Sequence, residues 1–503
     1  MIFVCLIFKY LNLDCIMWNF VKYSYNYLRL GYTLHQLYTS WSDTQRVEVC
    51  LYEQMVRQVQ SCGAVAIKFI QWFHPLLELR FIDEDDYHKE NYKDKLPWWI
   101  KKLEIFYENC DIHSFDYTIQ EYKRSFDRDL MEEYDILDVL GSGSIGQVYL
   151  VQRKGTTEKI VMKIVHPDID VQIDSFEFCL KYMYRIPKVK SLLETLSIDL
   201  FSFIKCFRKQ QDMVKEGNNL LKMYTIYKDN PHIHIPELYG VSENILLMEY
   251  IEGCDFDKLQ CKPYEKLKIY TMFYLFMRNN ITCENFNHGD LHSGNWKVHE
   301  DRGIVVYDYG FCWSAPSEKK HTVDKAIIVC EGSNLQNRDQ TIKLVSELMF
   351  DLLVHEHIQD KSTLMEKICE YVKSSQFVGM CEDEKDISIS PINIFQLLTN
   401  FCIINHVMID YNLIQFLIIF IQIQRHCITY GYASSENDTI YPDIKIYKER
   451  YANCLNFCRT YNVYPKYANY IKNKLNELQV DRTSIFDTVD FSDEIRKLAV
   501  SKI

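Results

Sequence analysis

The sequence lacks the patterns that mark several classes of protein. Its eighteen cysteines form no C-x-x-C pair, and the closest two are Cys454 and Cys458. That spacing fits neither a zinc ribbon nor a thioredoxin-like redox motif. The N-terminal residues do not resemble a secretory signal with a small-residue cleavage site. We therefore expect reduced, mostly buried thiols in a cytosol-like compartment.

Long hydrophobic runs, internal repeats and proline-rich linkers are also absent, and the 503 residues include only eleven prolines. The most lipid-like stretch, YNLIQFLIIFIQIQ at residues 411–424, contains three glutamines. It is predicted to be a buried helix, because a bilayer span needs about 20 apolar residues. The apolar run IFVCLIF at residues 2–8 is shorter still. There we expect either a helix docked on the body of the protein or a membrane-interfacial or targeting segment.

Positive charge is in deficit, since 57 Lys and Arg stand against 69 Asp and Glu, giving a formal net charge of −12. This balance disfavours broad electrostatic binding to nucleic acid or to an anionic membrane surface. A chain of this length with 48% hydrophobic residues can bury several cores. It predicts a folded protein with two to four domains or one large bilobal unit.

Hydrophobic periodicity changes along the chain. Residues 45–80 have helical spacing, and short β-like runs begin at Tyr134 with YDILDVLG, GQVYLVQR and KIVMKIVH. A helical stretch at 174–228 precedes a strand-like NILLMEYIEG, and nearly everything after Gly253 is helical apart from WKVHE and IVVYDYG. The pattern predicts an α+β chain with a helical extension at 1–130, a small β-rich lobe at 131–251 and a larger helical lobe at 252–503.

A glycine-rich segment closes the first β-like hairpin. GSGSIGQV, residues 141–148, fits G-x-G-x-x-G-x-V, in which backbone N–H groups can cradle phosphates. Glycines also serve ordinary hairpin turns, so the segment alone is weak evidence for phosphate binding. Its candidate nucleotide-binding residues are Gly141, Gly143, Ser144, Gly146 and Val148.

Lys163 stands between apolar neighbours in VMKIV, so we expect an inward-facing ammonium that needs an anionic partner. The partners predicted are the α- and β-phosphates of ATP and Glu216 in QQDMVKEGNNLL. The alternative for Glu216 is a surface glutamate paired with a nearby lysine. In LLMEYIEG, Met248 is predicted to back an adenine pocket, with the backbone from Glu249 to Ile251 contacting the adenine edge. The alternative there is an apolar strand followed by a turn.

The segment HGDLHSGNWKVHEDRGIVVYDYG, residues 288–310, contains two carboxylates and an amide at kinase-like spacing. Asp290 is predicted to orient the acceptor hydroxyl, while Asn295 and Asp308 are predicted to bind Mg²⁺. Hard oxygen ligands suit Mg²⁺ better than Zn²⁺, so we expect His288 to brace the loop by hydrogen bonds. The order of glycine loop, lysine, glutamate, hinge, D-x-x-x-x-N and D-x-G predicts a bilobal protein-kinase-like fold.

Two absences argue against a conventional protein kinase. Gly289 replaces the arginine that receives an activation-loop phosphate in many protein kinases, and the chain after Asp308 enters a helical pattern almost at once. Little room remains for a long activation segment and a peptide-docking loop. We therefore do not expect a protein substrate held in extended form.

These motifs resemble those of the UbiB, or aarF-domain, family of atypical kinases, which includes the ADCK-like proteins. The resemblance covers roughly residues 55 to 430. It rests on SIGQVY (144–149), VMKIVHP (161–167), HGDLHSGN (288–295), DYG (308–310) and DMVKEGNNL (212–220). IKFIQW (67–72) is similar to the family's K-x-G-Q signature, which implies that Lys68 and Gln71 of an added helical extension reach toward the active site and restrict it. The sequence departs from the family at Ile70, at Gln210 and in a glycine-bearing rather than alanine-rich loop.

The resemblance implies an Mg²⁺-dependent, ATP-binding kinase or ATPase that hydrolyses ATP or phosphorylates a small or lipid-like acceptor in support of quinone or lipid metabolism. It also implies possible peripheral membrane association and a mitochondrial or membrane-associated location. Two alternatives stay open at this point. One is a small-molecule phosphotransferase of the aminoglycoside or choline kinase type, which shares HGDLHxGN, and the other is a nucleotide-gated scaffold that binds ATP without turnover.

Overall fold

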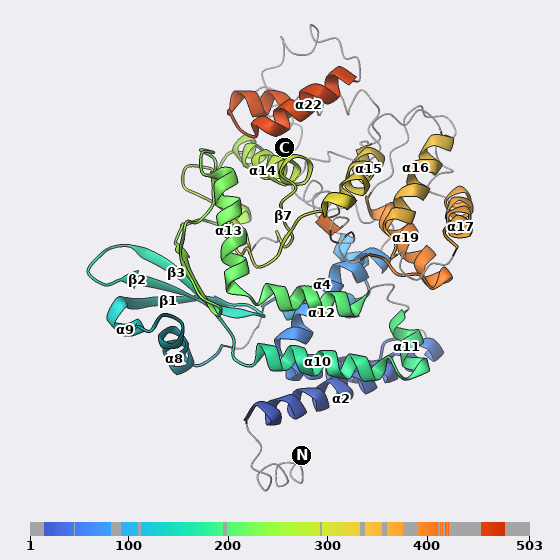
Figure 1. Ribbon diagram of the computed structural model, residues 1–503, viewed down its shortest axis with the longest axis horizontal. Helices are drawn as coiled ribbons and strands as arrows, with labels where there is room; N and C mark the ends of the chain where they lie inside the picture. Colours follow the sequence, from blue (N-terminus) through green and yellow to red (C-terminus); the bar gives the residue numbers. More distant parts are fainter. Residues whose placement is uncertain are drawn as a thin grey trace.

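The computed structural model in Figure 1 shows a five-stranded sheet beside a larger, mostly helical body. The elements that it describes are an α+β arrangement, as the sequence predicts. The described residues are 15–44, 46–81, 92–108, 112–194, 199–291, 294–331, 338–354, 360–375, 391–410, 413, 415, 418, 419, 421 and 454–477.

The five-stranded sheet has the order β1-β2-β3-β6-β5, and all of its neighbouring strands are antiparallel. Successive side chains of a strand point to opposite faces. Ile160, Met162 and Ile164 of β3 therefore share one face, and Lys163 lies on the other face between Val161 and Val165. The strands are β1 (Tyr134–Ser142), β2 (Gly146–Arg153), β3 (Lys159–Val165), β5 (Leu238–Val241) and β6 (Ile245–Glu249).

The first face of this sheet is covered by α8 (Phe115–Phe126) and α9 (Leu130–Glu133). Tyr122 and Leu130 from these helices are buried in one hydrophobic cluster with Tyr149, Ile160 and Met162. The boundary expected at residue 130 thus falls inside a packed unit, because α8 joins the sheet rather than the helices that precede it.

The other face of the sheet packs on helices that follow β3. Val161, Val165, Leu246 and Met248 share a core with residues of the last of these helices. The helices are α10 (Ile169–Met183), α11 (Pro187–Glu194), α12 (Leu200–Gln210) and α13 (Met213–Tyr227). The helix that carries Glu216 therefore lies against the face that carries Lys163.

The helices before residue 110 pack on α10 and α4, and α2 and α10 lie side by side along the lower edge of Figure 1. Gly63 separates α3 from α4 at φ 87°, and a Cβ there would lie 2.4 Å from the Gln172 side-chain oxygen, so this break requires glycine. The elements are α2 (Cys15–Thr44), α3 (Val49–Cys62), α4 (Ala64–Phe81), η1 (Tyr92–Lys95), α6 (Trp98–Lys101), η2 (Lys102–Glu104) and α7 (Ile105–Glu108).

The body after residue 251 is helical around two small sheets. One sheet pairs β7 (Asn287–His288) with β10 (Cys312–Trp313), and the other has the order β4-β9-β8, from β4 (Ile233–His234), β8 (Trp296–Val298) and β9 (Ile304–Val306). The remaining elements are η3 (Phe256–Lys258), α14 (Pro263–Asn279), η4 (Asn280–Glu284), η5 (Ser317–Lys319), α15 (Lys320–Glu331), α16 (Arg338–Asp351), α17 (Lys361–Ser374), α19 (Pro391–Asn405) and α22 (Pro465–Glu477).

Two sequence expectations concern apolar segments. Within the 411–424 stretch, Leu413, Ile418, Ile419 and Ile421 are helical and buried, as expected of a buried helix. The run at residues 2–8 lies outside the described residues. Among the helices that the structure describes, none has both the length and the apolar composition needed to cross a membrane.

Candidate active site

Lys163 is buried, with 7% of its surface exposed, and its ammonium lies at the centre of the predicted site. Its Nζ donates to both carboxylate oxygens of Glu216, at 2.8 and 3.0 Å, and to Oδ1 of Asp308 at 3.0 Å. Burial disfavours the charged ammonium, but the carboxylates of Asp308 and Glu216 outweigh it and raise the pKa of Lys163. The buried cation is therefore fully compensated by residues from two distant parts of the chain.

Glu216 reaches Lys163 from the first turn of α13. The helix begins after Asp212, whose side chain accepts a hydrogen bond from the Lys215 N–H at 3.1 Å. Glu216 is 1% exposed, and burial raises the pKa of its carboxyl to about 7 against the opposing effect of Lys163. The surface-glutamate alternative does not describe this residue, because its carboxylate is buried and paired with Lys163.

Asp308 follows β9 in a left-handed conformation with φ 55°, which aspartate tolerates better than most residues. Its Oδ1 accepts hydrogen bonds from Lys163 and from the Gly310 N–H at 3.1 Å. Burial would raise the pKa of the Asp308 carboxyl, but the ammonium groups of Lys163 and Lys68 hold this pKa below its usual range. Its side chain still keeps 47% of its surface exposed. An ionised, accessible carboxylate of this kind can hold a divalent cation.

The loop around Asp290 is braced by His288, as the sequence suggests. The Asp290 N–H donates to His288 Nδ1 at 3.2 Å, so the His288 Nε2–H donates to the Tyr307 carbonyl at 2.9 Å. Burial lowers the pKa of His288, consistent with a neutral ring. Both ring nitrogens are thus engaged within the protein, which argues against a zinc site there. The second histidine of the HGDLHSGN segment, His292, lies outside the described residues.

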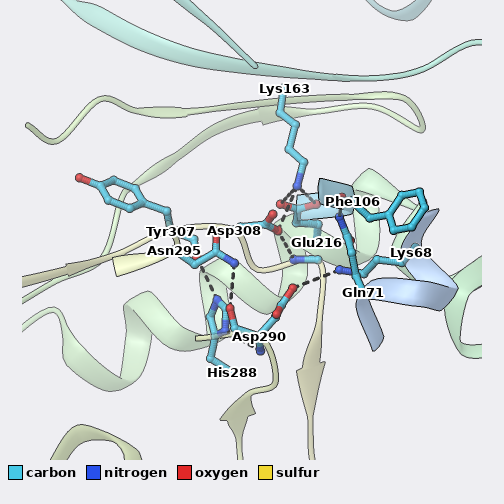
Figure 2. Close-up of polar contacts among 11 residues, drawn as sticks. Lys68, Gln71, Phe106, Lys163, Glu216, His288, Asp290, Asn295, Tyr307 and Asp308 are labelled. Atoms are coloured by element: carbon cyan, nitrogen blue, oxygen red, sulfur yellow. Dashed lines mark hydrogen bonds and ion pairs between the residues drawn. The ribbon is translucent and has the colours of Figure 1, made fainter. Parts of the chain in front are cut away.

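Asn295 lies five residues after Asp290 and is 8% exposed. Its amide Nδ2 donates to the Asp290 backbone carbonyl at 2.8 Å. This bond orients the side chain so that its oxygen is free to act as an acceptor or as a metal ligand. Figure 2 shows Asn295, Asp290 and Asp308 converging below Lys163.

Lys68 approaches the same place from α4. Its Nζ lies 3.1 Å from Asp290 Oδ2, and the two side chains are 18% and 34% exposed. Gln71 of the same helix donates to the Phe106 carbonyl at 2.8 Å. Ile70, which replaces the signature glycine, packs in the hydrophobic cluster formed by the N-terminal helices. The added apolar side chain therefore has a place, while Lys68 contacts the predicted acceptor-orienting residue.

The glycine loop connects β1 to β2, and Gly141 and Val148 pair across the two strands. The Gly143 N–H donates to the Gly146 carbonyl at 2.9 Å, which closes the turn around Ser144. Val148 also pairs with Lys163 on β3. The loop is thus joined in register to the strand that carries the central lysine.

The predicted hinge is partly engaged within the protein. Met248 is buried on β6, the Glu249 N–H donates to the Glu237 carbonyl at 2.9 Å, and the Ile251 carbonyl accepts from the Tyr307 hydroxyl at 2.8 Å. Sequence reasoning missed Tyr307, which joins the hinge to the segment before Asp308. Its place directly after β9 was visible, but its partner was not.

Sequence reasoning also missed His113, which holds the glycine loop. Its Nδ1 lies 2.8 Å from His166 Nδ1, and its backbone N–H donates to the Gln147 side chain at 3.0 Å. His166 Nε2 in turn lies 3.0 Å from the Gly143 carbonyl. The segment that leads into α8 is therefore connected to the glycine loop through His113 and His166.

Comparison with known proteins gives a family assignment for this arrangement. Residues 106–340 match the family described as ABC1 atypical kinase-like domain. This range includes Lys163, Glu216, Asp290, Asn295 and Asp308, whereas the KFIQ segment at 68–71 lies outside it.

Three relatives are similar over this region. "Probable serine/threonine-protein kinase abkC" of Dictyostelium discoideum is 28% identical over 48% of this chain and 34% of its own length. "Protein ACTIVITY OF BC1 COMPLEX KINASE 3, chloroplastic" of Arabidopsis thaliana is 22% identical over 40% and 28%, respectively. "Probable protein kinase UbiB" of Pectobacterium carotovorum is 26% identical over 44% and 42%. The chain thus spans less than half the length of each of these relatives.

The resemblance inferred from SIGQVY and HGDLHSGN is confirmed by the family match and by these relatives. Residues 106–340 match the ABC1 atypical kinase-like domain, and over this region the chain is similar to UbiB and ADCK-like atypical kinases.

Proposed function

We propose that the chain binds ATP with Mg²⁺ and catalyses phosphoryl transfer or ATP hydrolysis as an atypical kinase. The observation that carries this proposal is the convergence of Lys163, Glu216 and Asp308 within 3.0 Å contacts, beside Asp290 and Asn295. In this proposal Lys163 and Glu216 position the α- and β-phosphates. Asn295 and Asp308 bind Mg²⁺, and Asp290 orients the acceptor.

The five-stranded sheet and the helices after Gly253 would form the two lobes of a kinase, with the hinge from Glu249 to Ile251 between them. The hydrogen bonds of the hinge restrict how adenine could bind there. Since the Glu249 N–H and the Ile251 carbonyl have partners within the protein, adenine would use the Glu249 carbonyl and the Ile251 N–H. The backbone of Gly141, Gly143, Ser144 and Gly146 would cover the phosphates.

The acceptor in this proposal is a small or lipid-like molecule rather than a protein segment. β10 and η5 follow closely on Asp308, and α15 begins at Lys320, only twelve residues later (320 − 308). So short a connection offers little platform for an extended peptide. Similarity to UbiB and ADCK-like atypical kinases favours a role in quinone or lipid metabolism, and we extend the proposal to a peripheral membrane association.

The ion pair between Lys68 and Asp290 favours a second candidate, a nucleotide-gated scaffold. While Lys68 holds Asp290, a hydroxyl acceptor cannot take the same position. ATP binding without turnover would then serve to hold partners, with α4 acting as a lid.

The test is thermal stabilisation by ATP with and without Mg²⁺, on the wild type and on Asp308→Ala. Binding at a hundred times Kd contributes about 2.7 kcal/mol of stability. We expect an Mg²⁺-dependent rise in Tm for the wild type and loss of the Mg²⁺ dependence in Asp308→Ala. A wild type with no response to ATP would overturn nucleotide binding. A response without phosphate release would favour the scaffold.

A further inference from the structure

Three side chains outside the active site converge at the end of β4 and at the turn between β8 and β9. Nε2 of His234 lies 2.9 Å from Oδ2 of Asp301 and 3.1 Å from Oδ1. Nδ1 of His299 lies 3.0 Å from Oδ1 of the same carboxylate. The two imidazole rings are 4.5 Å apart between centroids. Two ring nitrogens and one carboxylate therefore face a common point.

The spacing of these atoms matches the donor separations of a metal centre. Zinc bonds of 2.0–2.2 Å at tetrahedral angles place neighbouring ligand atoms roughly 3.3 Å apart. The observed separations from Asp301 are 2.9 to 3.1 Å, and one ligand atom from each residue lies within 4.8 Å of the others. Small side-chain movements would therefore suffice to admit an ion.

The backbone holds the three residues in this arrangement. The Gly303 N–H donates to Asp301 Oδ1 at 2.8 Å, and the His299 N–H donates to the Gly303 carbonyl at 2.9 Å. β4 pairs in parallel with β9, with His234 opposite Val305. A Cβ at Gly303 would lie 2.6 Å from His234 Nε2, so glycine is what allows this ring to approach the turn.

We propose that His234, His299 and Asp301 bind a divalent transition-metal ion of the zinc type, which ties β4 to the β8–β9 hairpin. Two imidazoles and one carboxylate suit zinc and its neighbours, whereas Mg²⁺ and Ca²⁺ prefer oxygen ligands throughout. The side chains are 24%, 25% and 45% exposed, so water can complete the coordination.

The position of this site gives it a structural consequence. The β8–β9 hairpin has three residue pairs, from Val298↔Ile304 at the turn to Trp296↔Val306 at the other end. Asn295 immediately precedes β8, and Asp308 lies two residues beyond β9. At about 3.4 Å per residue, the four residues from His299 to Asn295 would place the metal roughly 14 Å of strand from that proposed Mg²⁺ ligand. It would fix the hairpin that presents both proposed ligands.

The test is titration of the full chain with Co²⁺ in excess Mg²⁺, followed by visible absorption. Four- or five-coordinate Co²⁺ gives d–d bands that do not depend on kinase activity. We expect bands that saturate at one equivalent and are displaced by Zn²⁺. They should be lost, or binding weakened at least tenfold, in His234→Gln and in His299→Gln, since even outer-shell changes weaken metal binding by 10- to 100-fold.

Two controls separate this site from other metal binding. The exposed His35 on α2 supplies a matched variant, His35→Gln, which should keep the bands, and Asp308→Ala should keep them as well. Unchanged circular dichroism of the His234 and His299 variants would show that they fold. Absence of the bands in the wild type, their persistence in both histidine variants, or their loss in Asp308→Ala would each overturn the proposal.

Discussion

Replacing Lys68 by glutamine should strengthen the binding of Mg²⁺ in the presence of ATP. The Lys68 ammonium lies 3.1 Å from Asp290 and lowers the pKa of Asp308 through space, so its positive charge opposes a metal ion at the Asp308 carboxylate. The pair is only partly buried, at 18% and 34% exposure. We therefore place its contribution at about 1 kcal/mol, the upper end of the range for exposed pairs. This corresponds to about a fivefold change in affinity.

The assay is titration of the protein with Mg²⁺ at fixed ATP, followed by thermal shift or calorimetry. The apparent Kd for Mg²⁺ should fall about fivefold in Lys68→Gln, and raising ionic strength should narrow the difference because salt screens the ion pair. Lys123→Gln, at an exposed position on α8, is the matched control and should behave as the wild type. An unchanged or weaker affinity for Mg²⁺ in Lys68→Gln would refute the reasoning.

Three further predictions concern stability. Glu216→Gln should lower the free energy of unfolding by about 3 kcal/mol. This is the lower end for a broken buried ion pair, because Asp308 still faces Lys163. A loss below about 1 kcal/mol, measured by urea unfolding, would contradict this prediction. Gly146→Ala should lower Tm because the new Cβ would lie 2.5 Å from the Ile164 carbonyl oxygen. Gly141→Ala should leave Tm unchanged, because a Cβ there would meet no atom within 4 Å. Equal effects of the two changes on Tm would be inconsistent with the loop geometry. Burial and the neighbouring His166 lower the pKa of His113 to about 4. As the pH falls, His113 therefore takes up its proton in the unfolded chain before it does so in the folded chain. The free energy of unfolding should fall by up to about 3 kcal/mol between pH 6.5 and 4. His113→Gln should flatten that slope, and an unchanged slope would rule out this origin.

The parts of the fold that could be predicted are those encoded by local pattern. The alternation in KIVMKIV places Lys163 opposite Ile160, Met162 and Ile164, and the structure has it on the face toward α13. The glycine loop, the helix that carries Glu216 and the strands on either side of Asp301 were likewise visible as short-range signals. Each depends on residues within about ten positions of one another.

The parts that could not be predicted depend on contacts between distant residues. The distance from Lys68 to Asp290 is 222 positions along the chain, and that from His113 to His166 is 53. His234 meets Asp301 across 67 positions, because β4 pairs with β9 in parallel. The register of these two strands brings His234 and Asp301 together, and no periodicity in the sequence indicates that register. Family resemblance suggested the direction of Lys68 but not that its partner would be Asp290.

The most direct test of the central claim is release of phosphate from ATP in a Lys68→Gln background, which removes the contact with residue 290. The three proteins compared are Lys68→Gln alone and Lys68→Gln combined with Asp290→Asn or with Asp308→Ala. Mg·ATP binding should be measured in the same samples. We predict that Asp290→Asn keeps Mg²⁺-dependent binding but loses turnover, and that Asp308→Ala loses both. Turnover in Asp290→Asn at the rate of Lys68→Gln alone, or full Mg²⁺-dependent binding in Asp308→Ala, would contradict the roles assigned to these two carboxylates.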